Sequence, residues 1–145
     1  MNATLQQLYQ GIILEHNAHP RNRGPLPDAT QEAHVDNPLC GDRVTLRLRC
    51  QDDRIVEARF EGDGCALSMA SASLLTTMVA ARPLVDALAL GDELRRLLGR
   101  GPEHEAVDRA RLGDLVAFEG TRQFPSRISC ATLAWDALAA ALVAR

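Results

Sequence analysis

Three cysteines that lie far apart along the 145-residue chain constrain its fold more than any other feature. Cys40 is followed two residues later by Asp42, so one tight turn can offer a thiolate and a carboxylate to the same ion. Cys65 and Cys130 each stand at the expected start of a helix. Three thiolates and one carboxylate form a complete tetrahedral ligand set for zinc. A fold that uses them together must bring these distant segments to one point.

The spacing of the cysteines leaves two interpretations open: a metal site, or small buried side chains without chemical function. The chain has no Cys-x-x-Cys pair, which is a stronger local zinc signal, and isolated cysteines are often small, inert, buried side chains. Glycines beside Cys40 and Cys65 leave room above the sulfur and favour a metal site. At a helix start, free N–H groups and the helix dipole stabilise an anion, so we expect lowered thiol pKa values for Cys65 and Cys130.

Composition bounds the class of protein. The net charge of −3 and the pI near 5.8 do not indicate binding to nucleic acid or to an anionic membrane. No stretch approaches the ~20 apolar residues of a membrane span. The chain contains no lysine, which excludes Schiff-base and phosphate-loop lysine chemistry. We expect a cytoplasmic protein, where spaced cysteines more often bind metals or react than form disulfides.

Two runs of alternating apolar and polar residues predict a β-hairpin. Residues 44–50 have apolar side chains at every second position, ending with Cys50, which we expect to be an inert part of that face. Residues 54–60 form the second strand, and three apolar residues share its inner face: Val56, Ala58 and Phe60. A third strand is expected near residues 34–35.

Helical periodicity and the positions of glycine and proline predict the other elements. The expected helices cover residues 4–18, 65–81, 84–99 and 130–144, with a short helix near 103–110. The chain from there through Phe124-Pro125 is expected to be a loop. The sequence therefore predicts one α+β domain over residues 1–145, with a small antiparallel sheet of about three strands packed against several helices.

The cysteine segments resemble the SufU branch of the IscU/NifU-like iron–sulfur cluster assembly family. The matching segments are Pro20-Arg-Asn22, Asn37-Pro-Leu-Cys-Gly-Asp42, Gly62-Asp-Gly-Cys-Ala-Leu-Ser-Met-Ala-Ser71 and Phe124-Pro-Ser-Arg-Ile-Ser-Cys-Ala-Thr-Leu-Ala-Trp135. The segment around residues 99–122 is similar to an insertion in SufU-type members. Ser129 departs from both branches, because IscU-type members carry histidine at this position and SufU-type members usually carry lysine.

The resemblance implies a SufU/IscU-like fold and a zinc ion, and assigns the ligands to four residues: Cys40, Asp42, Cys65 and Cys130. It also implies that Cys40 receives persulfide sulfur from a SufS-type cysteine desulfurase and passes it to downstream iron–sulfur assembly or acceptor proteins. Arg127 matches an arginine at the partner surface in that family.

Three functional hypotheses follow from the resemblance. The leading one is a zinc-dependent sulfurtransferase with Cys40 as the sulfur acceptor. The main alternative is a scaffold on which iron or a transient [2Fe–2S] cluster is held by the same thiolates. A purely structural zinc module is the third.

Overall fold

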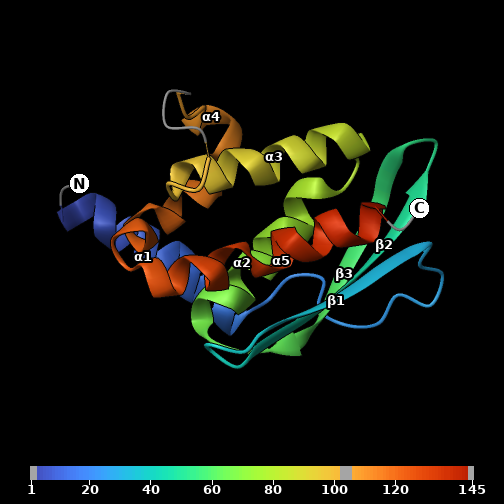
Figure 1. Ribbon diagram of the computed structural model, residues 1–145, viewed down its shortest axis with the longest axis horizontal. Coiled ribbons are helices and arrows are strands. Elements are labelled where there is room, and N and C mark those ends of the chain that lie inside the picture. Colours follow the sequence, from blue (N-terminus) through green and yellow to red (C-terminus); the bar gives the residue numbers. More distant parts are fainter. Residues whose placement is uncertain (1–2, 102–105, 144–145) are drawn as a thin grey trace.

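The computed structural model describes residues 3–101 and 106–143. Three strands, β1 (Gln31–Asn37), β2 (Asp42–Gln51) and β3 (Arg54–Asp63), form one antiparallel sheet in the order β1-β2-β3. The helices lie on one face of this sheet (Figure 1). The α+β class, the hairpin and the third strand are therefore confirmed, although all three strands are longer than predicted.

Alternation decides which side chains of the sheet are buried. Val44, Leu46 and Leu48 of β2 point to the helices and have no exposed surface. The residues between them project from the open face, where arginines pair with acidic side chains of β1 and β3; Arg47, for example, bonds both Glu32 and Glu61. The sheet thus has one apolar and one charged face, as expected for an antiparallel sheet covered on one side.

A β-bulge corrects the prediction for β3. Arg49 of β2 pairs with Glu57, but its neighbour Cys50 pairs with Ile55, so Val56 is an extra residue without a partner in the ladder. The extra residue shifts the alternation, since the bulged strand has two residues opposite one. Ile55 is therefore fully buried and Val56 is 39% exposed. The prediction that Val56 shares the inner face was wrong, whereas Ala58 and Phe60 are buried as expected.

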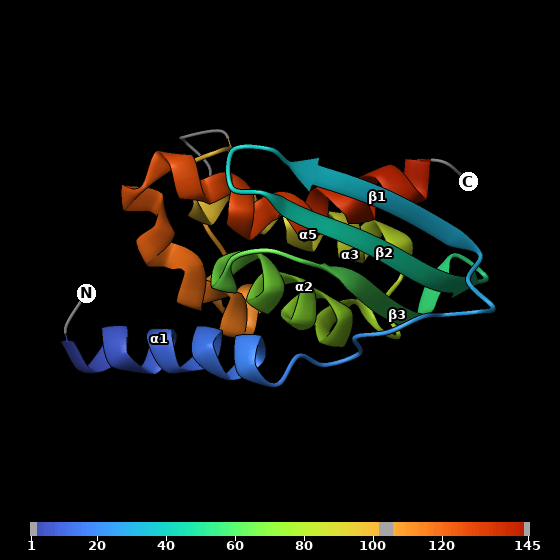
Figure 2. The ribbon, with the colours of Figure 1, turned by 90° about the horizontal axis from the view of Figure 1, so that it is seen from below.

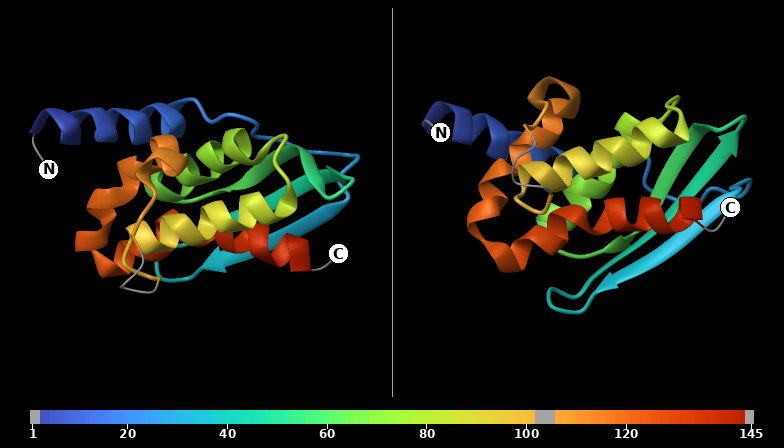
Figure 3. Two further views of the ribbon diagram at one scale, coloured as in Figure 1. Left: turned by 90° about the horizontal axis from the view of Figure 1, so that it is seen from above. Right: turned by 45° about the horizontal axis from the view of Figure 1, so that its top comes forward.

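Two helices cover the sheet directly. Helix α2 (Ala66–Val79) packs on β3, and α5 (Pro125–Val143) packs on β1 and β2. Helix α1 (Ala3–Ala18) packs along α2, and it ends at the residue before His19-Pro20, as predicted (Figure 2). Helix α3 (Leu84–Leu97) packs against α5 on the side away from the sheet (Figure 3). The core therefore has two parts. One lies between the sheet and helices α2 and α5, and the other lies between these two helices and the outer helices α1 and α3.

Small residues let α2 and α5 approach closely. Ser68 and Ser71 of α2 are fully buried, and their hydroxyls donate to the backbone carbonyls of Cys130 and Ala131 in α5, over 3.2 and 2.6 Å. Ser71 Oγ also accepts from Nε1 of the buried Trp135, over 3.2 Å. These bonds fix the position of α5 along α2.

The chain before α5 is more helical than predicted. A short helix, α4 (Arg109–Leu112), is followed by a 3₁₀ helix, η1 (Gly113–Gln123), where a loop was expected. Helix α5 begins at Pro125, five residues earlier than predicted, because proline suits the first position of a helix, where no N–H is needed. The short helix expected near 103–110 lies partly outside the described residues.

Among the described residues, α5 is the one helix long and apolar enough to cross a membrane. Most of its side chains are buried by the sheet, α2 and α3, including Leu133, Leu138 and Leu142. Helix α5 is therefore the central core helix of this fold.

The β-bulge can be tested by comparing substitutions at two neighbouring residues, Ile55 and Val56. Ile55→Ala should lower the free energy of unfolding by about 2–5 kcal/mol, because it leaves a cavity in the core. Val56→Ala should change it by no more than about 0.5 kcal/mol, because this side chain faces solvent. Urea unfolding of both variants measures the difference. Equal losses would contradict the bulge.

Candidate metal centre

The four predicted ligands come from four places in the fold that meet at one end of the sheet. Cys40 lies in the turn between β1 and β2, and Asp42 is the first residue of β2. Cys65 immediately precedes α2, and Cys130 lies within α5. The β1–β2 turn, the start of α2 and the start of α5 lie at the same end of the molecule in Figure 2.

Three of the four predicted side chains form one cluster, and the fourth, Cys65, lies beside Asp42. Cys130 Sγ is 3.0 Å from Cys40 Sγ, and the ligand atoms of these cysteines and Asp42 all lie within 4.8 Å of one another. Cys65 Sγ lies 4.0 Å from Asp42 Oδ2. Sulfurs that are each about 2.3 Å from one tetrahedral ion are roughly 3.8 Å apart. The 3.0 Å between the sulfurs of Cys40 and Cys130 is shorter than this spacing, so these two side chains would have to separate to hold one ion, and Cys65 would complete the donor set from its position beside Asp42.

The Asp42 carboxylate is held by one backbone group and by neighbouring side chains. It is 1% exposed, and Oδ1 accepts the N–H of Cys65 over 2.8 Å. Burial disfavours the charged form, but the hydrogen bonds from Cys65 N–H and from Ser68 and the cysteine thiols outweigh it, so the pKa of Asp42 lies below its usual range. Gly64 makes the approach possible, since a Cβ at this position would lie 2.4 Å from Oδ1.

Cys40 is the half-buried member of the group formed with Asp42 and Cys130, and Cys65 beside them is half-buried as well. The turn that carries it is closed by two hydrogen bonds to Asn37 O, from the N–H groups of Cys40 and Gly41. Gly41 has a φ of +72°, which suits glycine. Cys40 is half-buried, whereas Asp42 and Cys130 are buried. A thiol from another molecule can therefore reach Cys40 more easily than Cys130.

The prediction of a lowered pKa for Cys130 was wrong. Because α5 begins at Pro125, Cys130 lies in its second turn rather than at its N-terminus, and it has no exposed surface. Burial, hydrogen bonding with Cys40 and Asp42, and the nearby charge of Cys65 all raise the pKa of the Cys130 thiol. A thiolate here needs a compensating positive charge, and metal binding supplies one as the proton leaves.

Cys65 stands where the sequence predicted, at the N-cap of α2, and its side chain makes no capping hydrogen bond. The sulfur is half-buried and lies 3.8 Å from Ser68 Oγ. Because Ser68 also bonds the carbonyl of Cys130, it links the surroundings of both cysteines.

The sequence analysis missed the role of Asn37, the last residue of β1. Its side chain is 5% exposed, and Nδ2 lies 3.0 Å from Ser129 Oγ, 3.4 Å from Asp42 Oδ2 and 3.6 Å from Cys130 Sγ. Ser129, the residue that departs from the family pattern, thus accepts a hydrogen bond from a residue of the cysteine motif. The register pairs Asn37 with Asp42 across the hairpin, so the length of the turn was a usable signal for the contact between these two residues.

The other two candidates lie apart from the cluster. Arg127 is exposed on the first turn of α5 and lines a groove beside α1. Cys50 is partly buried and packs against the core from β2, in agreement with a structural role.

Comparisons with known proteins agree with this geometry. The NifU-like N-terminal domain family model matches residues 8–131. The zinc-dependent sulfurtransferase SufU of Bacillus subtilis is 40% identical over 137 residues, which cover 94% of this chain and 90% of that protein. The iron–sulfur cluster assembly scaffold protein IscU of Streptococcus pyogenes is 36% identical over 138 residues, covering 95% and 84% of the two chains.

A solved structure shows the same fold. The putative iron–sulfur cluster assembly scaffold protein of the SUF system from Fervidobacterium islandicum superposes with a TM-score of 0.84 at 28% identity, covering 94% of this chain and 98% of that one. The chain belongs to the NifU-like N-terminal domain family, among the SufU- and IscU-type proteins. The similarity to Bacillus subtilis SufU confirms the resemblance to SufU-type members that the sequence motifs indicated.

Asn37 gives a test of how the cluster is held. With Zn²⁺ as the probe ion, Asn37→Ala should weaken metal binding by about 10–100-fold, because groups that hydrogen-bond to metal ligands orient them. Competition with a coloured chelator measures the affinity, and Asn17→Ala, an exposed change at the end of α1, is the control. Equal zinc affinities for the two variants would contradict the role of Asn37.

Proposed function

We propose that the protein acts in iron–sulfur cluster assembly as a zinc-dependent sulfur acceptor, in which Cys40 takes persulfide sulfur from a SufS-type cysteine desulfurase. The observation that supports this best is the position of Cys40, which is half-buried on the β1–β2 turn beside the buried Cys130 and Asp42, whereas Cys65, also half-buried, is held at the start of α2. The similarity to a zinc-dependent sulfurtransferase over 94% of the chain adds support.

The donor set suits zinc. Cys40, Asp42, Cys65 and Cys130 would hold the ion, and zinc would keep their sulfurs deprotonated without redox chemistry of its own. The raised pKa of the Cys130 thiol makes a bound cation important for this residue in particular. Asp42 is already ionised near neutral pH, because its pKa lies below the usual range.

The transfer itself is a thiol exchange in which atoms and electrons balance. The Cys40 thiolate attacks the outer sulfur of the partner's cysteine persulfide, and a new S–S bond forms at Cys40. The S–S bond of the donor breaks, and its electron pair leaves with the donor cysteine as a thiolate. The sulfane sulfur keeps its oxidation state, so no external oxidant or reductant is needed.

The remaining residues of the site position the two segments that carry Cys40 and Cys130. Asn37 and Asp42 hold the two ends of the turn that carries Cys40, since they form the last pair of the β1–β2 ladder. Ser68 and Ser71 fix the segment of α5 that carries Cys130. The Cys40 thiol is therefore presented on a turn beside a rigid base, where a donor can approach it. A downstream assembly or acceptor protein would then remove the sulfur by a second exchange of the same kind.

The alternative is a scaffold that holds a [2Fe–2S] cluster on the same thiolates, as the name of the Streptococcus pyogenes relative suggests. The position before Cys130 does not separate the two functions, because Ser129 matches neither the histidine of IscU-type members nor the lysine usual in SufU-type members. Its hydroxyl accepts a hydrogen bond from Asn37.

Metal analysis separates the two functions. Anaerobically purified protein should contain about one zinc per chain and be colourless, because zinc has no visible d–d absorption as a d¹⁰ ion. It should also stimulate a cognate cysteine desulfurase. Stoichiometric iron and sulfide with a visible chromophore would instead support the scaffold.

Cys40→Ser should abolish the transfer of ³⁵S from the desulfurase to this protein, because it removes the attacking thiolate. Cys50→Ser is the matched control, since Cys50 lies away from the cluster and should keep full labelling. Mass spectrometry of the labelled chain locates the sulfur. Full labelling of Cys40→Ser would reject Cys40 as the acceptor, and a loss of thermal stability alone would indicate a structural zinc module.

A further inference from the structure

The sulfurs of Cys40 and Cys130 lie closer together than two ligands of one zinc ion. Their Sγ atoms are 3.0 Å apart, whereas two sulfurs bound to the same tetrahedral ion are roughly 3.8 Å apart. A disulfide bond is about 2.05 Å long, so the two atoms are within about 1 Å of a covalent bond. One sulfur comes from the β1–β2 turn and the other from α5, so such a bond would join the sheet to the central core helix.

The geometry favours this pair of cysteines over the others. Cys65 is not part of the group of ligand atoms that all lie within 4.8 Å of one another. Its sulfur lies beside Asp42 instead, 4.0 Å from Oδ2. Cys50 packs against the core from the far end of β2. Cys40 and Cys130 are therefore the two thiols placed to react with each other.

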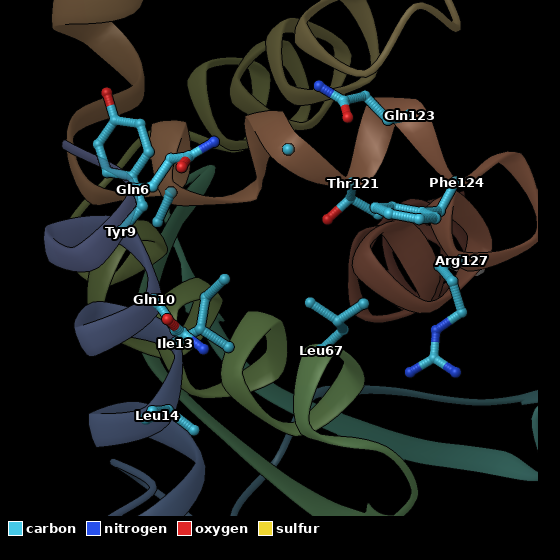
Figure 4. Close-up of a pocket in the computed structure, with 12 residues that line it drawn as sticks. Gln6, Tyr9, Gln10, Ile13, Leu14, Leu67, Thr121, Gln123, Phe124 and Arg127 are labelled. Atoms are coloured by element: carbon cyan, nitrogen blue, oxygen red, sulfur yellow. The ribbon is translucent and has the colours of Figure 1, made fainter. Parts of the chain in front are cut away.

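The two cysteines differ in how an oxidant can reach them. Cys40 is half-buried on its turn, whereas Cys130 has no exposed surface. No cysteine is among the described residues that line the groove beside α1, so the exposed part of Cys40 opens to solvent outside that groove (Figure 4). An accessible cysteine that is oxidised first, next to a second cysteine that resolves the product, is typical of redox-sensing sites.

Burial favours a disulfide over free thiolates at this place. Burial of Cys130 and its hydrogen bond with Cys40 raise the pKa of its thiol, so a negative charge there is disfavoured. A disulfide carries no charge, and burial does not oppose it. The backbone at Cys130 is also fixed, since Ser68 donates to its carbonyl over 3.2 Å. Cys130 is thus held where the Cys40 sulfur can reach it.

We propose that Cys40 and Cys130 form a reversible disulfide when the site holds no metal and hydrogen peroxide is present, so that the same two sulfurs hold either an ion or each other. Cys40 Sγ attacks the O–O bond of the peroxide and becomes a sulfenic acid, and water leaves. Cys130 Sγ then attacks Cys40 Sγ, the S–O bond breaks, and the departing hydroxide takes the Cys130 proton to form a second water. The two thiols lose two hydrogens and two electrons, and the peroxide is reduced to two waters. A thiol reductant restores both cysteines by exchange.

The disulfide removes two of the four proposed ligands and the proposed acceptor thiol in one step. It also stops oxidation at a reversible stage, since neither sulfur is left free to become a sulfinic acid. The bond itself does not depend on the proposed function, and only the loss of sulfur acceptance that follows from it does.

Tryptic mapping tests the pairing, because each cysteine lies in a different tryptic peptide. The chain has no lysine, and cleavage after arginine places Cys40 in residues 24–43 and Cys130 in residues 128–145. The metal-free, full-length protein is treated with hydrogen peroxide, its remaining thiols are alkylated, and the digest is analysed by mass spectrometry. These two peptides should be joined with the loss of two hydrogens, and dithiothreitol should separate them. Cys50→Ser should give the same joined peptides, and Cys40→Ser should give none.

Zinc affinity gives a second readout. The oxidised protein should bind Zn²⁺ at least about 100-fold more weakly than the reduced protein, because two thiolates are no longer available as ligands. Dithiothreitol should restore the affinity. Competition with a coloured chelator measures both states.

The outcomes separate the disulfide from the proposed function. Joined peptides that contain Cys65, sulfinic acid at Cys40 without joined peptides, or four unmodified thiols would each overturn the disulfide and leave the sulfur-acceptor function in place. In a mixture of ¹⁵N-labelled and unlabelled protein, pairs that combine the two isotopes would show a bond between chains and would also overturn it. If the disulfide forms but Cys40→Ser takes up full ³⁵S, the acceptor function is wrong and the disulfide stands. The peptide map of the unaltered chain decides the pairing, so this result does not depend on how Cys40→Ser folds.

Discussion

The hydrogen bond between the Asp42 carboxylate and the N–H of Cys65 connects the sheet to the helical layer, and the proposed metal centre depends on it. Asp42 begins β2, and Cys65 caps α2, so this bond sets the distance between a strand and a helix that are far apart in sequence. It also satisfies one of the free N–H groups at the start of the helix, and it compensates part of the cost of burying a carboxylate. The turn that carries Cys40 is attached to the same residue.

The rest of the site is positioned by the close contact of α2 with α5. Alanine and serine along α2 leave room for the α5 backbone, and Ser68 and Ser71 bond its carbonyls at Cys130 and Ala131. These contacts make one side of the centre rigid. The opposite side is a turn with a half-buried thiol. A half-buried thiol on a turn beside a rigid base suits the sulfur exchange proposed for this protein.

Local patterns predicted most elements, and long-range contacts account for the failures. The alternation of β2 was predicted because strand periodicity is a local signal, whereas the convergence of Cys40, Asp42 and Cys130 was expected from the resemblance of their motifs to the family. The bulge at Val56 was not predicted, since a bulge depends on how two strands pair. Pro125 was interpreted as the end of a loop although it begins α5, and this error misplaced Cys130 by a helical turn. The bond from Asn37 to Ser129 joins residues 92 positions apart, and no local pattern reveals it.

The location of Cys130 has a consequence beyond chemistry. The helix that carries it also supplies Trp135 and Leu138 to the core, so an ion held at this cysteine restrains the element on which the whole fold is packed. A ligand that binds only the native state shifts the folding equilibrium toward that state in proportion to its free concentration. Zinc availability in the cell would then govern the lifetime of the polypeptide, since unloaded copies would open more often and meet proteases sooner.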